Sequence, residues 1–130
     1  MRRTIRIRLG MVLLIGAEWR LRTFVRAELV ERGHEVFAVE TWDEAHMLLA
    51  AGAVRPDVTV FDLTGEDNPE AALRSLAAQV SPESVLVLTG SALPDAGAAG
   101  GLGYRHVVAR PFDVGQVVRR IEVLLEEAER

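Results

Sequence analysis

The stretch Val58-Thr59-Val60-Phe61-Asp62-Leu63 decides the fold of this chain of 130 residues. Its apolar, largely β-branched character is typical of a strand that is buried on both faces of a parallel sheet. Four more runs of this kind occur along the chain, and we expect a strand at each of them: Met11–Ile15, Val36–Val39, Val85–Leu88 and Val107–Val108.

The segments between these runs have the apolar spacing and the end signals of helices. Gly33 stands where the first helix ends, Thr41-Trp42-Asp43-Glu44 is a capping box, and Asn68-Pro69 begins the third helix. The fourth segment, 91–103, contains Pro94 and four glycines, which predicts a short or frayed helix. The last helix begins at Asp113, with Gln116 three residues on. Repeated strand–helix units with right-handed crossovers predict a three-layer α/β sandwich.

Helical spacing also predicts which side chains are buried. In the first helix it places Leu21, Phe24, Val25 and Leu29 on the inner face. In the last helix the apolar core face consists of Val114, Val117, Val118, Ile121, Leu124 and Leu125, and the outer side is charged: Arg119, Arg120, Glu122, Glu126, Glu127 and Glu129.

Composition excludes several classes of function. The chain has no cysteine, which excludes disulfides, thiolate metal sites and a cysteine nucleophile. Its 15 basic residues are all arginine, and with 19 acidic residues the net charge is −4. Residues 1–10 hold four of the arginines and no acid, so the remainder has 11 basic and 19 acidic residues, a net charge of −8. Such an acidic body repels a phosphate backbone, and we expect no direct nucleic-acid partner.

The basic residues 1–10 form a lead-in to the domain expected at 11–130. Residues 4–9 alternate with period two, which fits either an extended segment at a sheet edge or a disordered lead-in. The arginines followed by an apolar run resemble a signal peptide, but Arg6 and Arg8 interrupt it, and Ile15 and Ala17 make a poor cleavage site. No stretch approaches the roughly 18 apolar residues that span a bilayer. We therefore expect a cytoplasmic protein with no membrane partner.

Polar residues follow the predicted strands where ligands bind in open parallel sheets, at the carboxyl edge. Gly16-Ala17-Glu18 follow the first strand, Asp62 ends the third, Thr89 follows the fourth, and Arg110-Pro111 follow the fifth. This set suits an anion, but because ion pairs at strand ends are common, the sequence slightly favours a structural ion pair between the carboxylate of Asp62 and Arg110.

These motifs resemble the receiver domains of two-component response regulators over about residues 11–127. The most specific parts are Pro56-Asp57 with Asp62-Leu63, and Arg110-Pro111-Phe112; the others are Val12–Ile15, Leu21-Arg22, Gly33–Val36 and Val85–Gly90. The resemblance implies a flavodoxin-like (βα)5 fold with a five-stranded parallel sheet in the order 2-1-3-4-5. It also implies that Asp62 is at the phosphoacceptor position, that Thr89 is the switch hydroxyl, and that a cis peptide bond precedes Pro111.

The sequence departs from the family pattern at the acidic pocket. Gly16 and Ala17 stand where the family has two adjacent acids that hold Mg²⁺, so Glu18, Asp62 and Thr64 are the remaining candidate ligands. We expect no cofactor, or Mg²⁺ held weakly. Arg110 replaces the family's lysine, and Val107 replaces its aromatic residue.

Three functions are compatible with this pattern, and none requires an enzyme. The first is a receiver-like module with a defective phosphorylation site that signals by protein–protein contact. The second is a working receiver that a histidine kinase phosphorylates on Asp62, and the third is a small-molecule or nucleotide-binding module. The expected partners are a histidine kinase or an output protein. We expect a monomer or a weak homodimer through the fourth helix, fifth strand and fifth helix.

Overall fold

The computed structural model describes residues 9–90 and 93–128, with the side chains of 93–96 left aside. Five parallel strands form one sheet in the order β2-β1-β3-β4-β5, so the predicted order is confirmed. The strands are β1 (Met11–Ile15), β2 (Glu35–Val39), β3 (Val58–Asp62), β4 (Val85–Thr89) and β5 (His106–Ala109). The helices are α1 (Trp19–Glu31), α2 (Trp42–Ala50), α3 (Pro69–Ala77), α4 (Leu93–Gly101) and α5 (Val114–Ala128), with a 3-10 turn at Pro82–Ser84.

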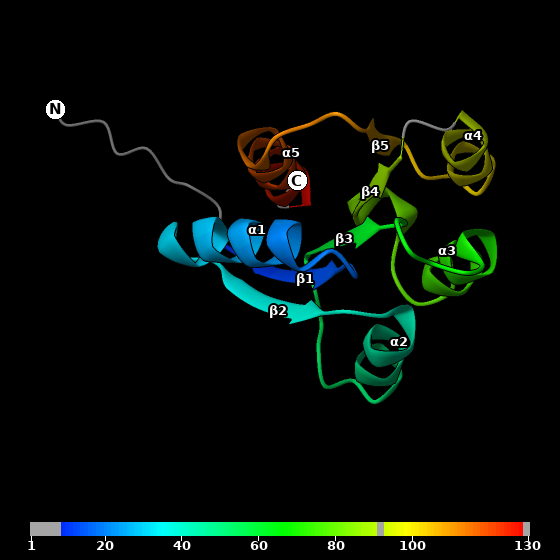
Figure 1. Cartoon of the computed structure of the whole chain (residues 1–130). Coiled ribbons are helices and arrows are strands. Elements are labelled where there is room, and N and C mark those ends of the chain that lie inside the picture. The colour runs from blue at the N-terminus through cyan, green and yellow to red at the C-terminus, as the bar shows by residue number, and fades with distance from the viewer. Residues whose placement is uncertain (1–8, 91–92, 129–130) are drawn as a thin grey trace, which may run out of the picture.

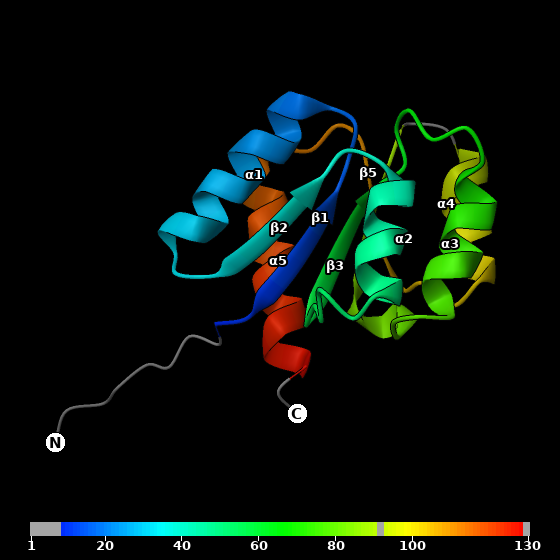
Figure 2. The same ribbon diagram turned by 90° about the horizontal axis from the view of Figure 1, so that it is seen from below.

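The helices cover both faces of the sheet, which gives the predicted three layers. Helices α1 and α5 lie on one face, and α2, α3 and α4 lie on the other (Figures 1 and 2). Each strand contributes to both apolar cores because successive side chains point to opposite faces. In β1, for example, Val12 and Leu14 pack with α1 and α5, whereas Leu13 and Ile15 pack with α2 and α3.

Local signals in the sequence explain where the helices begin. The Thr41 hydroxyl accepts the Glu44 amide at 3.2 Å, and the Asn68 side chain accepts the Ala71 amide at 3.2 Å. Asp113 and Gln116 cap each other's amides at 2.8 Å, which is a complete capping box. Helix α4 has nine residues, the same length as α2 and α3, so its glycines do not make it shorter than those helices.

Two side chains depart from the predicted burial. Phe24 is exposed because only Val25 and Leu29 of α1 are fully covered by the sheet and α5. Glu122 does not face the solvent on the outer side of α5. Its carboxylate instead accepts a hydrogen bond from Arg32 at 2.6 Å and lies 3.2 Å from the His34 ring.

Most of the basic lead-in, residues 1–8, lies outside the described residues; Leu9 and Gly10 belong to no strand. Among the described residues, no helix is long and apolar enough to cross a membrane.

Candidate functional site

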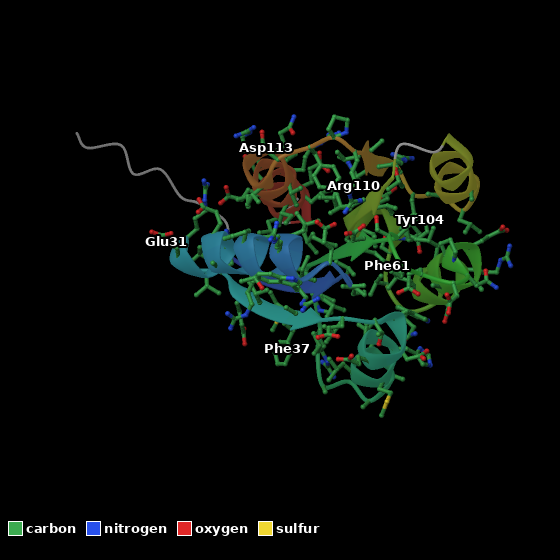
Figure 3. All side chains as sticks on the ribbon, in the orientation of Figure 1. Glu31, Phe37, Phe61, Tyr104, Arg110 and Asp113 are labelled. Atoms are coloured by element: carbon green, nitrogen blue, oxygen red, sulfur yellow. The ribbon has the colours of Figure 1, made fainter. Side chains whose placement is uncertain are left out.

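The carboxyl edge of the sheet brings the predicted polar residues together. Asp62 is the last residue of β3, Thr89 is the last residue of β4, and Arg110 directly follows β5. Because β3, β4 and β5 are neighbours in the sheet, their ends meet at one edge. The Arg110 side chain turns inward from the loop between β5 and α5 (Figure 3).

Arg110 and Asp62 form a two-pronged ion pair. The two Nη atoms of Arg110 donate to Oδ1 and Oδ2 of Asp62 at 3.1 and 2.8 Å. The Asp62 side chain is only 2% exposed, and its Oδ1 also accepts the Thr64 amide at 3.1 Å. Paired hydrogen bonds of this kind fix both direction and distance, so the carboxylate is held in one orientation.

Arg110 makes three further contacts that hold it over Asp62. One Nη donates to the main-chain oxygen of Thr89 at 3.2 Å, and the other donates to the Glu18 carboxylate at 3.0 Å. The guanidinium also lies 4.9 Å from the centre of the Phe112 ring. The hydrogen bond with Asp62, the charge of Asp62 and the contact with Glu18 raise the pKa of Arg110 above its ordinary value. The cation is therefore permanent at this site.

Glu18 has a different role from the helix cap that its position suggests. It is the N-cap residue of α1, but its side chain makes no capping hydrogen bond. Its carboxylate instead reaches Arg110, 92 residues later in the chain. A cavity of about 450 Å³ opens beside this contact, between α1 and the loop after β5, and Leu21, Pro111 and Phe112 complete its wall.

Gly16 and Ala17 leave no carboxylate next to Asp62. A Cβ added to Gly16 would lie 3.3 Å from the Asp62 Cβ, so the main chain of β1 runs close to that side chain. The main-chain oxygen of Gly16 is taken by Arg22, whose Nη1 donates to it at 2.6 Å. The same guanidinium lies 3.5 Å from the Glu40 carboxylate. A second arginine therefore lies at the end of β1.

The donor set at this edge does not fit Mg²⁺. The ion prefers six oxygen ligands in near-octahedral geometry. Here both Asp62 oxygens are bonded to Arg110, and Glu18 is bonded to the same cation. No group of three or more histidine, aspartate or glutamate side chains within the described residues is arranged to hold a metal. The charge of Asp62 is balanced by a guanidinium, and we derive no chemistry through a metal.

Thr89 and Pro111, the other predicted positions, adjoin the ion pair. The Thr89 hydroxyl is buried and donates to the main-chain oxygen of Gly90 at 3.0 Å. The main-chain oxygen of Thr89 itself accepts a hydrogen bond from Arg110. The peptide bond between Arg110 and Pro111 is cis, as the resemblance implies. Val107 in β5 is half-buried and carries no polar group.

Trp42, at the start of α2, contacts the residue that precedes Asp62 in β3. Trp19, the first residue of α1, is exposed beside Arg20. The Trp42 ring instead stacks on Phe61, the neighbour of Asp62, with the ring centres 5.9 Å apart. Its amide donates to Glu66 Oε1 at 3.3 Å, which ties the β3–α3 loop to the start of α2. The capping box locates Trp42 at a helix start, but only the fold brings it to Phe61.

A second cavity, of about 410 Å³, lies between α2 and α3. Its acidic wall consists of Glu40, Asp43, Glu66 and Asp67. Burial raises the pKa of Glu66, and the nearby charges of Asp43 and Asp67 add to that effect. This side of the molecule is therefore strongly negative.

Tyr104, which the sequence analysis did not single out, connects α3 to the segment before β5. Its side chain is buried, and its hydroxyl donates to the main-chain oxygen of Leu73. Burial raises the pKa of Tyr104 to about 12. The aromatic side chain in this part of the fold thus has a packing role beneath the edge strand.

Comparisons with solved structures identify the class of domain. No protein-family model and no curated protein matches the sequence. The receiver domain of the Francisella response regulator 1452 is similar with a TM-score of 0.75 and 18% identity, over 91% of this chain and 98% of that one. FixJ-N has a TM-score of 0.73 and 25% identity, over 89% and 93%. NtrX from Brucella abortus has a TM-score of 0.76 and 25% identity, over 93% of this chain but 28% of that one.

The fold is therefore that of the receiver domains of response regulators, and the resemblance seen in the motifs is confirmed. Within that fold, this chain has an arginine over the aspartate at the end of β3 and no paired acids at the end of β1.

Proposed function

We propose that this domain is a signalling module that acts through protein–protein contact and not through phosphorylation of Asp62. The observation that carries the proposal is the two-pronged bond from Arg110 to a carboxylate that is almost fully buried. Phosphoryl transfer depends on positioning and on neutralising charge around the reacting oxygens. Here the oxygens that would react are already bonded, and the cation that neutralises them is a fixed side chain.

A fixed charge implies a fixed conformation. In the proposed function, Arg110 joins the ends of β3 and β4 to α1 through its bonds to Asp62, Thr89 and Glu18. No change of charge at Asp62 is needed for these bonds to form. The domain then presents the same surface at all times, and its partners, such as a histidine kinase or an output protein, recognise that single state.

The two alternative functions each have one supporting feature. Asp62 and Thr89 are at the carboxyl edge, where a working receiver would need them. The cavity beside Arg110 could admit a small anion, but Asp62 and Glu18 already occupy the guanidinium. Both alternatives require Arg110 to leave its present bonds.

Exposure to a small phosphodonor tests the proposal. We expect the full chain, incubated with acetyl phosphate and millimolar Mg²⁺, to keep its unmodified mass by intact mass spectrometry. A phosphoryl adduct that disappears in Asp62→Asn would show a working phosphoacceptor and reject the proposal. A receiver domain with the paired acids and the lysine provides the positive control for the reagent.

A further inference from the structure

Strand β2 lies at one edge of the sheet. It pairs with β1, and no other strand in the described part of the chain runs along its outer edge (Figure 1). The Glu35 amide and the Val39 carbonyl are bonded to the residues that flank β1, so both groups point toward that strand. Because these directions alternate along a strand, the amides and carbonyls of Val36 and Ala38 point outward. None of the described loops and helices bonds to these outward groups.

Strand β2 lacks the features that usually protect a sheet edge. Edge strands are commonly kept from further pairing by lysine, by proline, by a bulge or by being very short. Strand β2 has five residues, pairs with β1 without a bulge, and contains one charged residue, Glu35, at its start. The other edge strand, β5, is one residue shorter, and Pro111, which has no amide to donate, follows it closely. The outer edge of β2 is therefore the better place for a further strand.

Phe37, at the centre of β2, offers an aromatic side chain to a strand that pairs at this edge. It is 41% exposed, whereas its neighbours Val36 and Ala38 are partly buried in the core under α1 and α5. Its ring points to the opposite side of the sheet, the side of α2 (Figure 3). Aromatic and β-branched side chains that lie opposite each other on neighbouring strands stabilise the pairing of those strands. A partner strand with an apolar residue opposite Phe37 would cover the exposed ring.

The segments that flank β2 are acidic. Five acidic residues lie between positions 31 and 44: Glu31, Glu35, Glu40, Asp43 and Glu44. The single arginine of this segment, Arg32, is already paired with Glu28 and Glu122. Of the five acids, only Glu40 has an arginine partner among the described residues, Arg22 at 3.5 Å. A second copy of this chain would bring the same acids together at the paired edges, whereas a basic segment would neutralise them.

We propose that the outer edge of β2 binds an extended, basic segment of a protein partner as an additional strand. Main-chain hydrogen bonds to Val36 and Ala38 attach the segment, an apolar side chain covers Phe37, and basic side chains meet the surrounding acids. The inference rests on the proposed function and names the surface through which the module contacts its partner. Strand β1 separates β2 from β3, which carries Asp62, so this edge is available without phosphorylation.

Titration of the full chain with a synthetic peptide tests the proposal. The peptide has a central phenylalanine with arginines on the same face, and valines on the other face. We expect amide hydrogen exchange, measured by NMR, to slow about tenfold at Val36 and Ala38 when the peptide binds. Exchange at Val107 and Ala109, the outward residues of β5, should not change. Glutamate in place of the peptide's arginines should weaken binding about tenfold, and proline in place of the valines beside the phenylalanine should abolish it.

Phe37→Ser should weaken peptide binding about tenfold, because the ring no longer contributes apolar contact to the paired strand. Met47→Ser is the matched control, since Met47 is 72% exposed on α2 and should not affect binding; thermal unfolding checks that both variants are folded. Unchanged exchange at Val36 and Ala38, equal binding of the glutamate peptide, or full binding by Phe37→Ser would overturn the proposal.

The two proposals fail in different experiments. A phosphoryl adduct on Asp62 would reject the proposed function, whereas an unmodified chain that does not bind the peptide would reject the β2 edge and leave the proposed function standing.

Discussion

Replacing Arg110 by methionine should destabilise the domain by about 2–3 kcal/mol. The variant loses the bonds of 3.1 and 2.8 Å to Asp62, and only the Thr64 amide continues to serve that carboxylate. Removing one partner of a fully buried ion pair costs about 3–5 kcal/mol. The value expected here is lower because the Arg110 side chain is 25% exposed, so that water can reach one side of the carboxylate in the variant. Methionine keeps the apolar stem but offers no donor.

Urea unfolding followed by circular dichroism measures this change, and Arg74→Met provides its control. Arg74 pairs with Glu70 at 2.9 Å on the surface of α3, where both side chains are more than half exposed, so that substitution should cost less than about 0.5 kcal/mol. A double-mutant cycle with Asp62→Asn isolates the pair itself, and we expect a coupling of about 2 kcal/mol. If Arg110→Met costs no more than Arg74→Met, or if the coupling is near zero, the ion pair does not hold this edge of the sheet.

Three more outcomes are expected. Thr59→Val should stabilise the domain by about 1 kcal/mol in urea unfolding, because the buried Thr59 hydroxyl has no hydrogen-bond partner among the described residues; a loss of stability would show that it has one. Glu66→Gln should raise the unfolding free energy at pH 7 but not below about pH 4. The raised pKa of Glu66 means that the folded protein disfavours its charged form, and this cost is present only where Glu66 is ionised. Glutamine still accepts the hydrogen bond from the Trp42 amide. An equal gain in unfolding free energy at both pH values would contradict this explanation. Glu126→Gln, which removes one negative charge from an exposed position, is the control for the change in net charge. Light scattering should show a monomer or a weak dimer that dissociates with salt, because Arg119, Arg120, Glu126 and Glu127 surround Val123 on α5; a dimer that persists at high salt would refute it.

The strands and helices were predictable because their signals are local. Apolar runs mark β1 to β5, and side chains within four residues of the starts of α2, α3 and α5 supply the caps of those helices. The order of the strands followed from the resemblance in the motifs, since spacing alone does not order a parallel sheet. The predicted burial of Phe24 was wrong because helical spacing predicts the direction of a buried helix face but not the width of that face.

The candidate site was predictable only in part, because its contacts join distant residues. The pairing of Asp62 with Arg110 followed from both being at strand ends. The turn of Glu18 toward Arg110 depends on the path of the loop after β5, 92 residues away, and local sequence does not encode that path. The stacking of Trp42 on Phe61 and the contact between His34 and Glu122 likewise join separate elements across the fold.

The central claim is that Arg110 holds Asp62 in place of a metal ion, and a Mg²⁺ titration tests it most directly. Trp42 is the reporter, because its ring stacks on Phe61 next to Asp62; a Trp19→Phe background removes the exposed tryptophan. We expect the emission of Trp42 to stay unchanged in millimolar Mg²⁺, with and without beryllofluoride as a phosphoryl mimic. A saturable change in emission with Mg²⁺ that tightens with beryllofluoride and is lost in Asp62→Asn would contradict the account.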